Sequence, residues 1–290
     1  MEIAPFDDRD GFIWMDGKFV PWREAKIHVL NHGLHYASCV FEGERIYNGK
    51  IFKLTEHSER LRKSAELLGF QIPYSVAELD KASKETVAKQ GVKDGYVRPF
   101  AWRGSEKMAI SSQTSKIHVA IASWPWPPYY SDEARNKGLK LAIADWRRPA
   151  PDTAPTASKA AGLYMICTMS KHKAEAAGFN DALMLDYRGL VAEATGANIF
   201  FVIDGKLHTP TPDCFLNGIT RLTVIDLAKK AGIEVIERHI KPEEMANATE
   251  AFLTGTAAEL TPIGSIDKYN FAIGNITKKL LEDYNKLVRN

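Results

Sequence analysis

Short apolar runs separated by turn-forming dipeptides dominate the first half of the chain. Residues 12–22 (FIWMDGKFVPW) contain two such runs on either side of Asp16-Gly17, and a similar turn follows at Asn48-Gly49. Asp-Gly and Asn-Gly favour the tight turns of β-hairpins. Apolar segments continue at residues 95–102 and 117–124, so the first half is predicted to be mostly β-sheet.

Apolar residues at helical spacing predict two helices within this mostly stranded half. Residues from Thr55 to Gly69 place leucine and alanine on one face and charged residues on the other, with Thr55 as the expected N-cap. Ser75-Val76-Ala77-Glu78 has the form of a capping box and opens a second helix to about Gln90. Arg60 lies beside the apolar face of the first helix, where its guanidinium can either bind a phosphate or pair with Glu56.

The run WPWPPYY, residues 124–130, contains too many prolines to continue a strand and marks the predicted domain boundary. We expect a small N-terminal domain over residues 1–124, an interdomain loop over 125–138 and a larger C-terminal domain over 139–290. The second half mixes two predicted helices, at about residues 161–177 and 218–231, with several predicted strands. These strands are expected at residues 139–144, 182–186, 190–194 and 198–203. The expected fold class is therefore α/β, in the broad sense that includes α+β.

Composition and charge argue against several classes of function. Lys and Arg number 38 against 36 for Asp and Glu, without a long basic block, so nucleic-acid binding is not expected. The apolar runs are too short to span a bilayer and the first residues lack the features of a secretory signal, so we expect a cytoplasmic protein without a membrane partner. Three widely spaced cysteines argue against a disulfide framework or a structural zinc site. The three histidines within residues 28–35 lack companion ligands, and no metal is expected.

Two charged residues stand alone in apolar surroundings in the second half. Lys159 lies among alanine, serine and glycine, and no other charge occurs between Asp152 and Lys171. Such a setting lowers the pKa of an amine and favours its nucleophilic free base. Glu193, alone in the run GLVAEATGANIFF, needs a cationic or hydrogen-bonding partner if it is buried. Either residue alone is more typical of a surface position, but an amine and an acid at opposite ends of one ring are what a pyridoxal phosphate enzyme requires.

Three further features suit the binding of anions. Asn217-Gly218-Ile219-Thr220 opens a predicted helix with backbone N–H groups and a hydroxyl that suit a phosphate. The small residues 255–258 let backbone amides approach a phosphate or carboxylate closely, or they form a tight turn. Arg98 and Arg103, in an aromatic strand, suggest carboxylate recognition, which salt bridges would also explain.

Taken in order along the chain, these segments resemble the fold-type IV pyridoxal phosphate transaminases, most closely the branched-chain amino acid aminotransferases. The resemblance covers nearly the whole chain and rests on the strings WMDGKFVPW, HGLHYASCVFEGERIY, EHSERL, YVRP, PTASKAAGLY, EATGANIF, NGITR and TGTAAELTP. Each string is weak alone, whereas their joint occurrence in family order is specific. The resemblance implies a two-domain fold like that of D-amino acid aminotransferase, pyridoxal 5'-phosphate as cofactor, and a homodimer or larger homo-oligomer whose second subunit completes the site.

The resemblance also implies a role for each matching residue. Lys159 is the expected catalytic residue, which forms a Schiff base with the cofactor and moves the substrate proton. Tyr164 is expected at the ring oxygen, Glu193 at the ring nitrogen and Leu216 against the face of the ring. The expected phosphate-binding residues are Arg60, Gly218, Ile219, Thr220, Gly255 and Thr256. The expected substrate pocket comprises Tyr36, Phe41, Gly43, Tyr96, Arg98, Arg103, Trp126, Tyr129, Thr256 and Ala257.

The implied reaction moves the amino group of L-leucine, L-isoleucine or L-valine to 2-oxoglutarate by a ping-pong mechanism. Two features depart from the pattern. Glu44 stands where branched-chain enzymes commonly have an apolar residue, and Arg103-Gly104 resembles the pair with which D-amino acid transaminases bind the α-carboxylate. Arg103 can point into the pocket or pair with Glu44 or Glu106. A transaminase of D-amino acids or (R)-primary amines is therefore an alternative. A same-fold aminodeoxychorismate lyase and a cofactor-free binding protein are two others.

Overall fold

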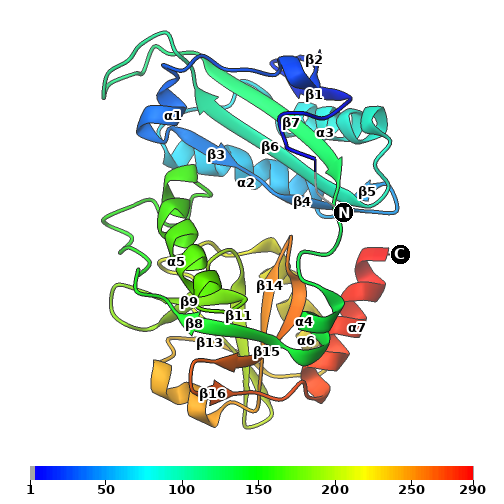
Figure 1. Cartoon of the computed structure of the whole chain (residues 1–290), viewed down its shortest axis with the longest axis vertical. Helices are drawn as coiled ribbons and strands as arrows, with labels where there is room; N and C mark the ends of the chain where they lie inside the picture. The colour runs from blue at the N-terminus through cyan, green and yellow to red at the C-terminus, as the bar shows by residue number, and fades with distance from the viewer. Residues whose placement is uncertain (1–3, 290) are drawn as a thin grey trace. The chain divides into compact units, whose positions relative to one another are not determined.

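A computed structural model describes residues 4–289 of the chain, apart from the side chain of Asp132. These residues form two compact units (Figure 1). The first unit comprises the residues up to Pro127 together with Ser158–Gly162, and the second comprises Pro128–Ala157 together with the residues from Leu163 onward. The short segment that carries Lys159 therefore belongs to the first unit, although its neighbours in the sequence belong to the second.

The first unit is built on a seven-stranded antiparallel sheet. Its strands follow the order β2-β1-β7-β6-β4-β5, and β3 also pairs with β6. The strands are β1 Phe12–Met15, β2 Lys18–Pro21, β3 Cys39–Phe41, β4 Glu44–Tyr47, β5 Lys50–Ile51, β6 Gly95–Arg103 and β7 Ile117–Pro125. Both predicted hairpins are confirmed, because Asp16-Gly17 and Asn48-Gly49 adopt the positive φ angles that such turns require.

Two helices cover one face of this sheet. They are α2, Leu54–Leu67, and α3, Val76–Gln90, and their apolar residues pack with Trp14, Val97 and Ile121 in one buried core. The capping box predicted at Ser75 is confirmed, since Ser75 Oγ accepts a hydrogen bond from Glu78 N and the Glu78 carboxylate accepts one from Ser75 N. Short helical turns lie at η1, Trp22–Glu24, and α1, His32–Tyr36.

The N-cap predicted at Thr55 is wrong. The N-cap of helix α2 lies two residues earlier, at Lys53, whose backbone has a left-handed conformation. The Thr55 hydroxyl instead donates a hydrogen bond of 2.6 Å to Asp80 on α3. The Thr55 side chain therefore links α2 to α3, whereas the local sequence pattern predicted that it would cap α2.

The second unit is built on a nine-stranded mixed sheet that closes on itself. Its order is β10-β9-β8-β15-β14-β11-β12-β13, with β16 paired to β15, and an additional pairing joins β10 to β11. Six strands, β8, β9, β10, β11, β14 and β15, thus form a ring without a free edge. The strands are β8 Leu139–Ile143, β9 Asp181–Leu185, β10 Val191–Ala194, β11 Asn198–Ile203, β12 Lys206–Pro210, β13 Val235–Arg238, β14 Glu250–Gly255, β15 Glu259–Ile266 and β16 Tyr269–Asn270.

Helices of the second unit pack against this sheet (Figure 1). They are α4 Asp132–Lys137, α5 Met165–Ala176, α6 Ile219–Lys230 and α7 Asn275–Arg289. Short helical turns lie at η2 Ala161–Tyr164, which begins in the first unit, and at η3 Pro242–Asn247. The segment 125–138, predicted as a loop, contains α4, which Ser131 caps through Ala134 N. Among the described residues, no helix is both long enough and apolar enough to cross a lipid bilayer.

Candidate active site

Backbone hydrogen bonds attach Lys159 to the first unit. Phe41 N, at the end of β3, donates to Lys159 O at 3.2 Å, and Lys159 N donates to Ser64 Oγ on α2 at 3.0 Å. The neighbouring Ser158 Oγ donates to Ser64 O at 2.9 Å. These bonds connect the lysine to both a strand and a helix, so the position of its backbone is well defined.

The surroundings of the Lys159 amine suit a nucleophile. Its Nζ lies 4.8 Å from the centre of the Phe41 ring. Burial, and then the positive charge of Arg60, lower the pKa of Lys159 from 10.5 to about 8, although the Glu42 carboxylate partly opposes the shift. The direction agrees with the expectation from the apolar sequence around this lysine.

This lowered pKa gives a prediction about stability. Between about pH 8 and 10.5 the unfolded chain keeps a proton on Lys159 that the folded protein has lost. Stability should therefore rise with pH across this window, by up to about 3 kcal/mol. The measurement is urea unfolding of the cofactor-free protein and of a Lys159→Met variant. The difference between the two curves isolates the lysine, and a difference that does not change with pH would contradict the lowered pKa.

A buried carboxylate holds Arg60 in place. Glu42, which is fully buried, accepts hydrogen bonds from Arg60 Nε at 2.7 Å and Arg60 Nη2 at 2.8 Å, and its Oε2 lies 2.6 Å from His57 Nδ1. Burial opposes ionisation of Glu42, but Arg60 and His57 outweigh it and hold its pKa well below the usual range. Arg60 thus turns inward, whereas Glu56, the alternative partner considered above, pairs with Lys53.

Replacing Glu42 by glutamine should destabilise the first unit. The amide would leave the largely buried Arg60 guanidinium without its counter-charge, and we expect the free energy of unfolding to fall by about 3 kcal/mol. Glu56→Gln is the matched control, because it removes an exposed ion pair of the same helix and should cost less than about 1 kcal/mol. Urea unfolding measures both, and equal stability of the two variants would be incompatible with this role of Glu42.

Several residues predicted for the substrate pocket gather beside Lys159 in the first unit. Arg98 lies 4.6 Å from the Phe41 ring and donates a hydrogen bond to the Tyr96 hydroxyl at 3.2 Å, and the Trp126 ring meets Tyr96 edge-on at 4.6 Å. A Cβ on Gly43 would fall 1.8 Å from the Tyr96 hydroxyl, so any larger residue there would displace the Tyr96 side chain. An aromatic surface with one guanidinium suits a substrate that has an apolar part and a carboxylate.

Arg103 does not join this group. Side chains alternate along β6, and Arg103 shares the helix-covered face with Val97 while Arg98 lies on the other face. Its guanidinium donates to Gly69 O at 2.7 Å and to Ser112 O at 3.1 Å, and it stacks on Phe70. The structure therefore places Arg103 neither with Arg98 nor in the ion pairs considered for it, because strand alternation sends the two arginines to opposite faces.

Glu44 and Tyr36, which the sequence also singled out in the first unit, differ in their burial. Glu44, on β4, is fully buried, and this burial raises the pKa of its carboxyl group well above the usual value. Glu44, which departs from the family pattern, therefore lies in the core of the first unit. Tyr36 ends α1 with 42% of its surface exposed and its ring 4.7 Å from that of His32.

In the second unit, Glu193 has the partners that its apolar surroundings require. It lies on β10 and is buried, with Arg148 Nε 3.4 Å from its Oε1 and Asn198 Nδ2 3.2 Å from its Oε2. Burial of Arg148 lowers the pKa of its guanidinium, but the nearby Glu193 carboxylate more than offsets this and raises the pKa. Tyr164, at the end of η2, adds to the upward shift. Each oxygen of the Glu193 carboxylate thus has a partner, Arg148 at Oε1 and Asn198 at Oε2.

The segment predicted to bind an anion lies at the start of α6. Gly218 is the N-cap, and Ile219 and Thr220 begin the first turn of the helix. The fully buried Arg221 anchors this end of the helix by donating to Asn217 Oδ1 at 2.9 Å and to Glu237 Oε2 at 2.7 Å. Two hydrogen bonds therefore fix this end of the helix, whose first backbone N–H groups are of the kind that bind anions.

The second predicted anion-binding segment is a tight turn. Residues 256–258 connect β14 to β15, and Gly255 pairs with Glu259 at the base of this hairpin. Thr256 and Ala257 lie in this turn, between the two strands.

Tyr129, also assigned to the substrate pocket, lies in the second unit before α4, with 46% of its surface exposed and its ring against Tyr130.

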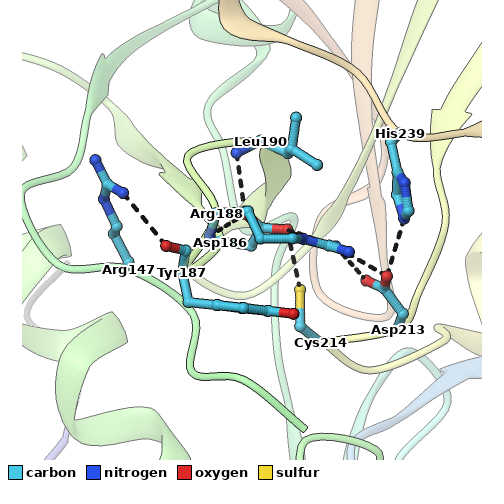
Figure 2. A network of polar contacts seen from close by, with 8 residues as sticks. All are labelled: Arg147, Asp186, Tyr187, Arg188, Leu190, Asp213, Cys214 and His239. Carbon is cyan, nitrogen blue, oxygen red and sulfur yellow. Dashed lines mark hydrogen bonds and ion pairs between the residues drawn. The ribbon is translucent and has the colours of Figure 1, made fainter.

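A polar network fastens the loop that carries Leu216. Figure 2 shows Arg188 between the carboxylates of Asp186 and Asp213, with His239 on the other side of Asp213. Arg188 Nε donates to Asp186 at 2.8 Å, Arg188 Nη2 donates to Asp213 at 2.8 Å, and His239 Nε2 lies 2.9 Å from Asp213. The loop after β12 is in this way tied to the turn between β9 and β10.

The same network explains the one group of metal-ligand side chains found in the described part of the chain. Oxygen and sulfur atoms of Asp186, Asp213 and Cys214 all lie within 4.8 Å of one another. Arg188, however, already donates hydrogen bonds to both carboxylates and supplies the positive charge between them. The two carboxylates are therefore paired with the Arg188 guanidinium, which occupies the place a metal ion would take.

Sequence reasoning missed Glu42, Arg148 and Asn198. Each is within hydrogen-bond or ion-pair distance of a predicted site residue, Arg60 or Glu193. A signal was present for two of them, because Glu42 and Asn198 lie inside the strings that carried the resemblance, between Phe41 and Gly43 and at the end of EATGAN. Arg148 follows a predicted strand and had no such signal.

Comparisons with known proteins test the expected family and fold. Residues 39–266 match the family described as amino-transferase class IV. A probable branched-chain-amino-acid aminotransferase of Rickettsia felis is 46% identical over 281 residues, which are 96% of each chain. The solved branched-chain aminotransferase of Thermoproteus uzoniensis with norvaline is 40% identical, with a TM-score of 0.92 over 97% of this chain and 95% of that one. The T.th. enzyme, solved with pyridoxamine 5'-phosphate, is 39% identical, with a TM-score of 0.93 over 97% and 96%. These matches confirm the expected fold class.

Proposed function

This chain belongs to the class IV aminotransferase family, and we propose that it moves the amino group of L-leucine, L-isoleucine or L-valine to 2-oxoglutarate. The observation that carries the proposal is the low-pKa amine of Lys159 beside Phe41, Tyr96 and Arg98. The relatives named above, which match nearly the whole chain, support the choice of branched-chain substrates.

Pyridoxal 5'-phosphate is the cofactor, and the residues present fit it. Lys159 offers a nucleophilic amine, Glu193 a directed carboxylate, and the start of α6 a phosphate site. The T.th. structure holds the amino form of this cofactor. When bound, the cofactor supplies an electron-withdrawing ring that stabilises negative charge on the substrate α-carbon.

The proposed division of work among the residues follows from their chemistry. Lys159 would hold the cofactor through its amine, and as a free amine it would move the substrate α-proton as a general base and acid. With the cofactor bound, Glu193 would hold a proton at the ring nitrogen, Tyr164 would donate a hydrogen bond to the ring oxygen, and Leu216 would pack against the ring. The phosphate is assigned to Arg60, Gly218, Ile219, Thr220, Gly255 and Thr256.

The substrate residues must accept two kinds of side chain in turn, because the amino acid and the oxo acid use the same pocket in a ping-pong reaction. We assign an apolar wall to Phe41, Tyr96 and Trp126, and the distal carboxylate of glutamate to Arg98. The remaining pocket residues are Tyr36, Gly43, Tyr129, Thr256 and Ala257. Arg103 is left out of this assignment because it bonds to Gly69 and Ser112 on the other face of β6.

We also propose that the enzyme is a homodimer or larger homo-oligomer. The first unit exposes large apolar side chains on two segments that touch through the hydrogen-bond contact of His32 Nε2 with Ala109 O. Val29, Leu34 and Ile110 are 72%, 67% and 83% exposed, and such a patch is typical of a protein interface. Analytical ultracentrifugation tests this, and a monomer at micromolar concentration would refute it.

A cytoplasmic location is the last part of the proposal. The three cysteines, Cys39, Cys167 and Cys214, are all free thiols, which suits a reducing compartment. Fractionation of the source cells tests this, and an extracellular enzyme would contradict it.

A half-reaction tests the proposed function directly. The cofactor-loaded enzyme is mixed separately with L-leucine, D-leucine and (R)-1-phenylethylamine, and the absorbance of the bound cofactor is followed. We expect L-leucine alone to convert the cofactor to its amino form, and 2-oxoglutarate to restore it. Conversion by D-leucine or the amine but not by L-leucine would establish the alternative specificity. Release of pyruvate from aminodeoxychorismate without an amino acceptor would establish the lyase.

A further inference from the structure

One amide side chain contacts two parts of the cofactor-binding machinery in the second unit. Asn198 begins β11 directly opposite Glu193 on β10. Its Nδ2 donates to Glu193 Oε2 at 3.2 Å and to Leu216 O at 3.0 Å, and its Oδ1 accepts from Gly218 N at 3.1 Å. The same side chain therefore touches the carboxylate assigned to the ring nitrogen and the turn assigned to the phosphate.

The chemistry of these contacts selects an amide. Two acceptors, a carboxylate and a carbonyl, face Nδ2, and one N–H donor faces Oδ1, so only one orientation of the amide satisfies all three. Aspartate would place a second negative charge against Glu193, and an apolar residue would leave the Gly218 N–H and the Leu216 carbonyl without this partner. Asn198 is only 4% exposed, so water cannot readily replace it.

The turn is built around this side chain. A Cβ added to Gly218 would lie 2.3 Å from Asn198 Oδ1, although the φ angle of Gly218, −67°, is open to any residue. Glycine is needed at position 218 because the amide approaches so closely. Arg148 supplies charge to the opposite oxygen of Glu193, and Asn198 supplies direction and the link to the turn.

We propose that Asn198 is a positioning residue that holds Glu193 and the turn Leu216–Gly218 in one arrangement, and so couples the binding of the cofactor ring to the binding of its phosphate. This inference rests on the proposed function. It predicts that a single substitution at Asn198 damages two binding events that substitutions at Glu193 or Thr220 damage separately.

Two fragments of the cofactor separate these events. Pyridoxal, which lacks the phosphate, reports on the ring end, and inorganic phosphate reports on the turn. Their dissociation constants are measured on the cofactor-free full-length chain, together with that of pyridoxal phosphate. We expect Asn198→Ala to weaken pyridoxal phosphate about 10- to 100-fold and each fragment about 5-fold or more.

The comparison variants define what coupling means. Glu193→Gln should weaken pyridoxal and leave phosphate within about 2-fold, whereas Thr220→Val should do the reverse. Asn198→Asp keeps an acceptor for Gly218 N but repels Glu193, so it should weaken pyridoxal more than phosphate. Asn270→Ala, which removes an exposed amide on β16 of the same sheet, is the matched control and should change none of the constants.

The outcomes separate the two levels of the proposal. A wild-type chain that binds neither pyridoxal nor pyridoxal phosphate would refute the proposed function itself. Wild-type binding with Asn198→Ala weakening only one fragment, or neither, would overturn the coupling alone. If Asn198→Ala fails to fold, as judged by circular dichroism, Asn198→Asp decides the question, and equal effects of that variant on both fragments would count against the inference.

Discussion

Replacing Lys159 by alanine should lower the turnover of L-leucine with 2-oxoglutarate by at least about 10⁴-fold. The substitution removes both the amine that carries the cofactor and the base that moves the α-proton, and Arg60, Arg98 and Glu42 cannot replace a neutral amine at that place. The variant should still bind pyridoxal phosphate, because the phosphate and ring contacts remain. Steady-state turnover and borohydride trapping measure the two effects: reduction should fix the cofactor to the wild-type protein only.

A lysine outside the site provides the control for this experiment. Lys140 is exposed on β8, and Lys140→Ala should keep wild-type turnover. A Lys159→Ala variant that retains more than a tenth of the wild-type rate would remove the proposed mechanism. Partial recovery of that variant by a small added amine, without recovery by added salt, would show that the missing group is the amine itself.

Replacing Glu193 by glutamine should lower turnover by about 10²- to 10³-fold, with a smaller effect on stability. A carboxylate stabilises a protonated ring nitrogen, and an amide of nearly the same shape does not, so the ring withdraws electrons less strongly in the variant. Glutamine has nearly the same shape but only one acceptor oxygen, so it can accept a hydrogen bond from Arg148 or from Asn198 but not from both. The measurements are turnover and the pH dependence of the absorbance of the bound cofactor.

The expected pattern distinguishes an electronic role of Glu193 from a structural one. Turnover should fall far more than cofactor affinity does, and the ring should lose its proton at lower pH than in the wild-type enzyme. A Glu193→Gln variant with normal turnover and a normal absorbance titration would show that the carboxylate does not act on the ring. If the Glu193→Gln variant lost turnover only because it unfolds, the role of Glu193 would be structural.

Local features were the most predictable part of this protein. The hairpin at Asp16-Gly17 and the capping box at Ser75 depend on a few adjacent residues, and both formed where expected. The Thr55 cap failed for the opposite reason, because its hydroxyl found Asp80 on another helix. The helix α4 inside a proline-rich segment shows that composition alone could not distinguish a linker from a short capped helix.

Partners were the least predictable part of the site. The sequence marked Glu193 as a charge that needs a partner and offered a phosphate or Glu56 to Arg60, but it could not name Glu42, Arg148 or Asn198. These pairs join different strands and helices, and one-dimensional spacing carries no record of such contacts. Arg98 and Arg103 looked equivalent in the sequence until strand alternation put them on opposite faces of β6.

The sequence by itself determined the family, the isolated nucleophile and the general order of strands and helices, because motif strings, composition and periodicity are properties of neighbouring residues. The tertiary structure alone decided that Lys159 is fastened to the first unit, that Glu42 holds Arg60 and that Asn198 joins Glu193 to the Gly218 turn. The physical reason is that buried charges and amides are satisfied by whatever the fold brings within about 3 Å. Such partners can be distant in the chain, since Glu42 is 18 residues from Arg60 and Ser64 is 95 residues from Lys159.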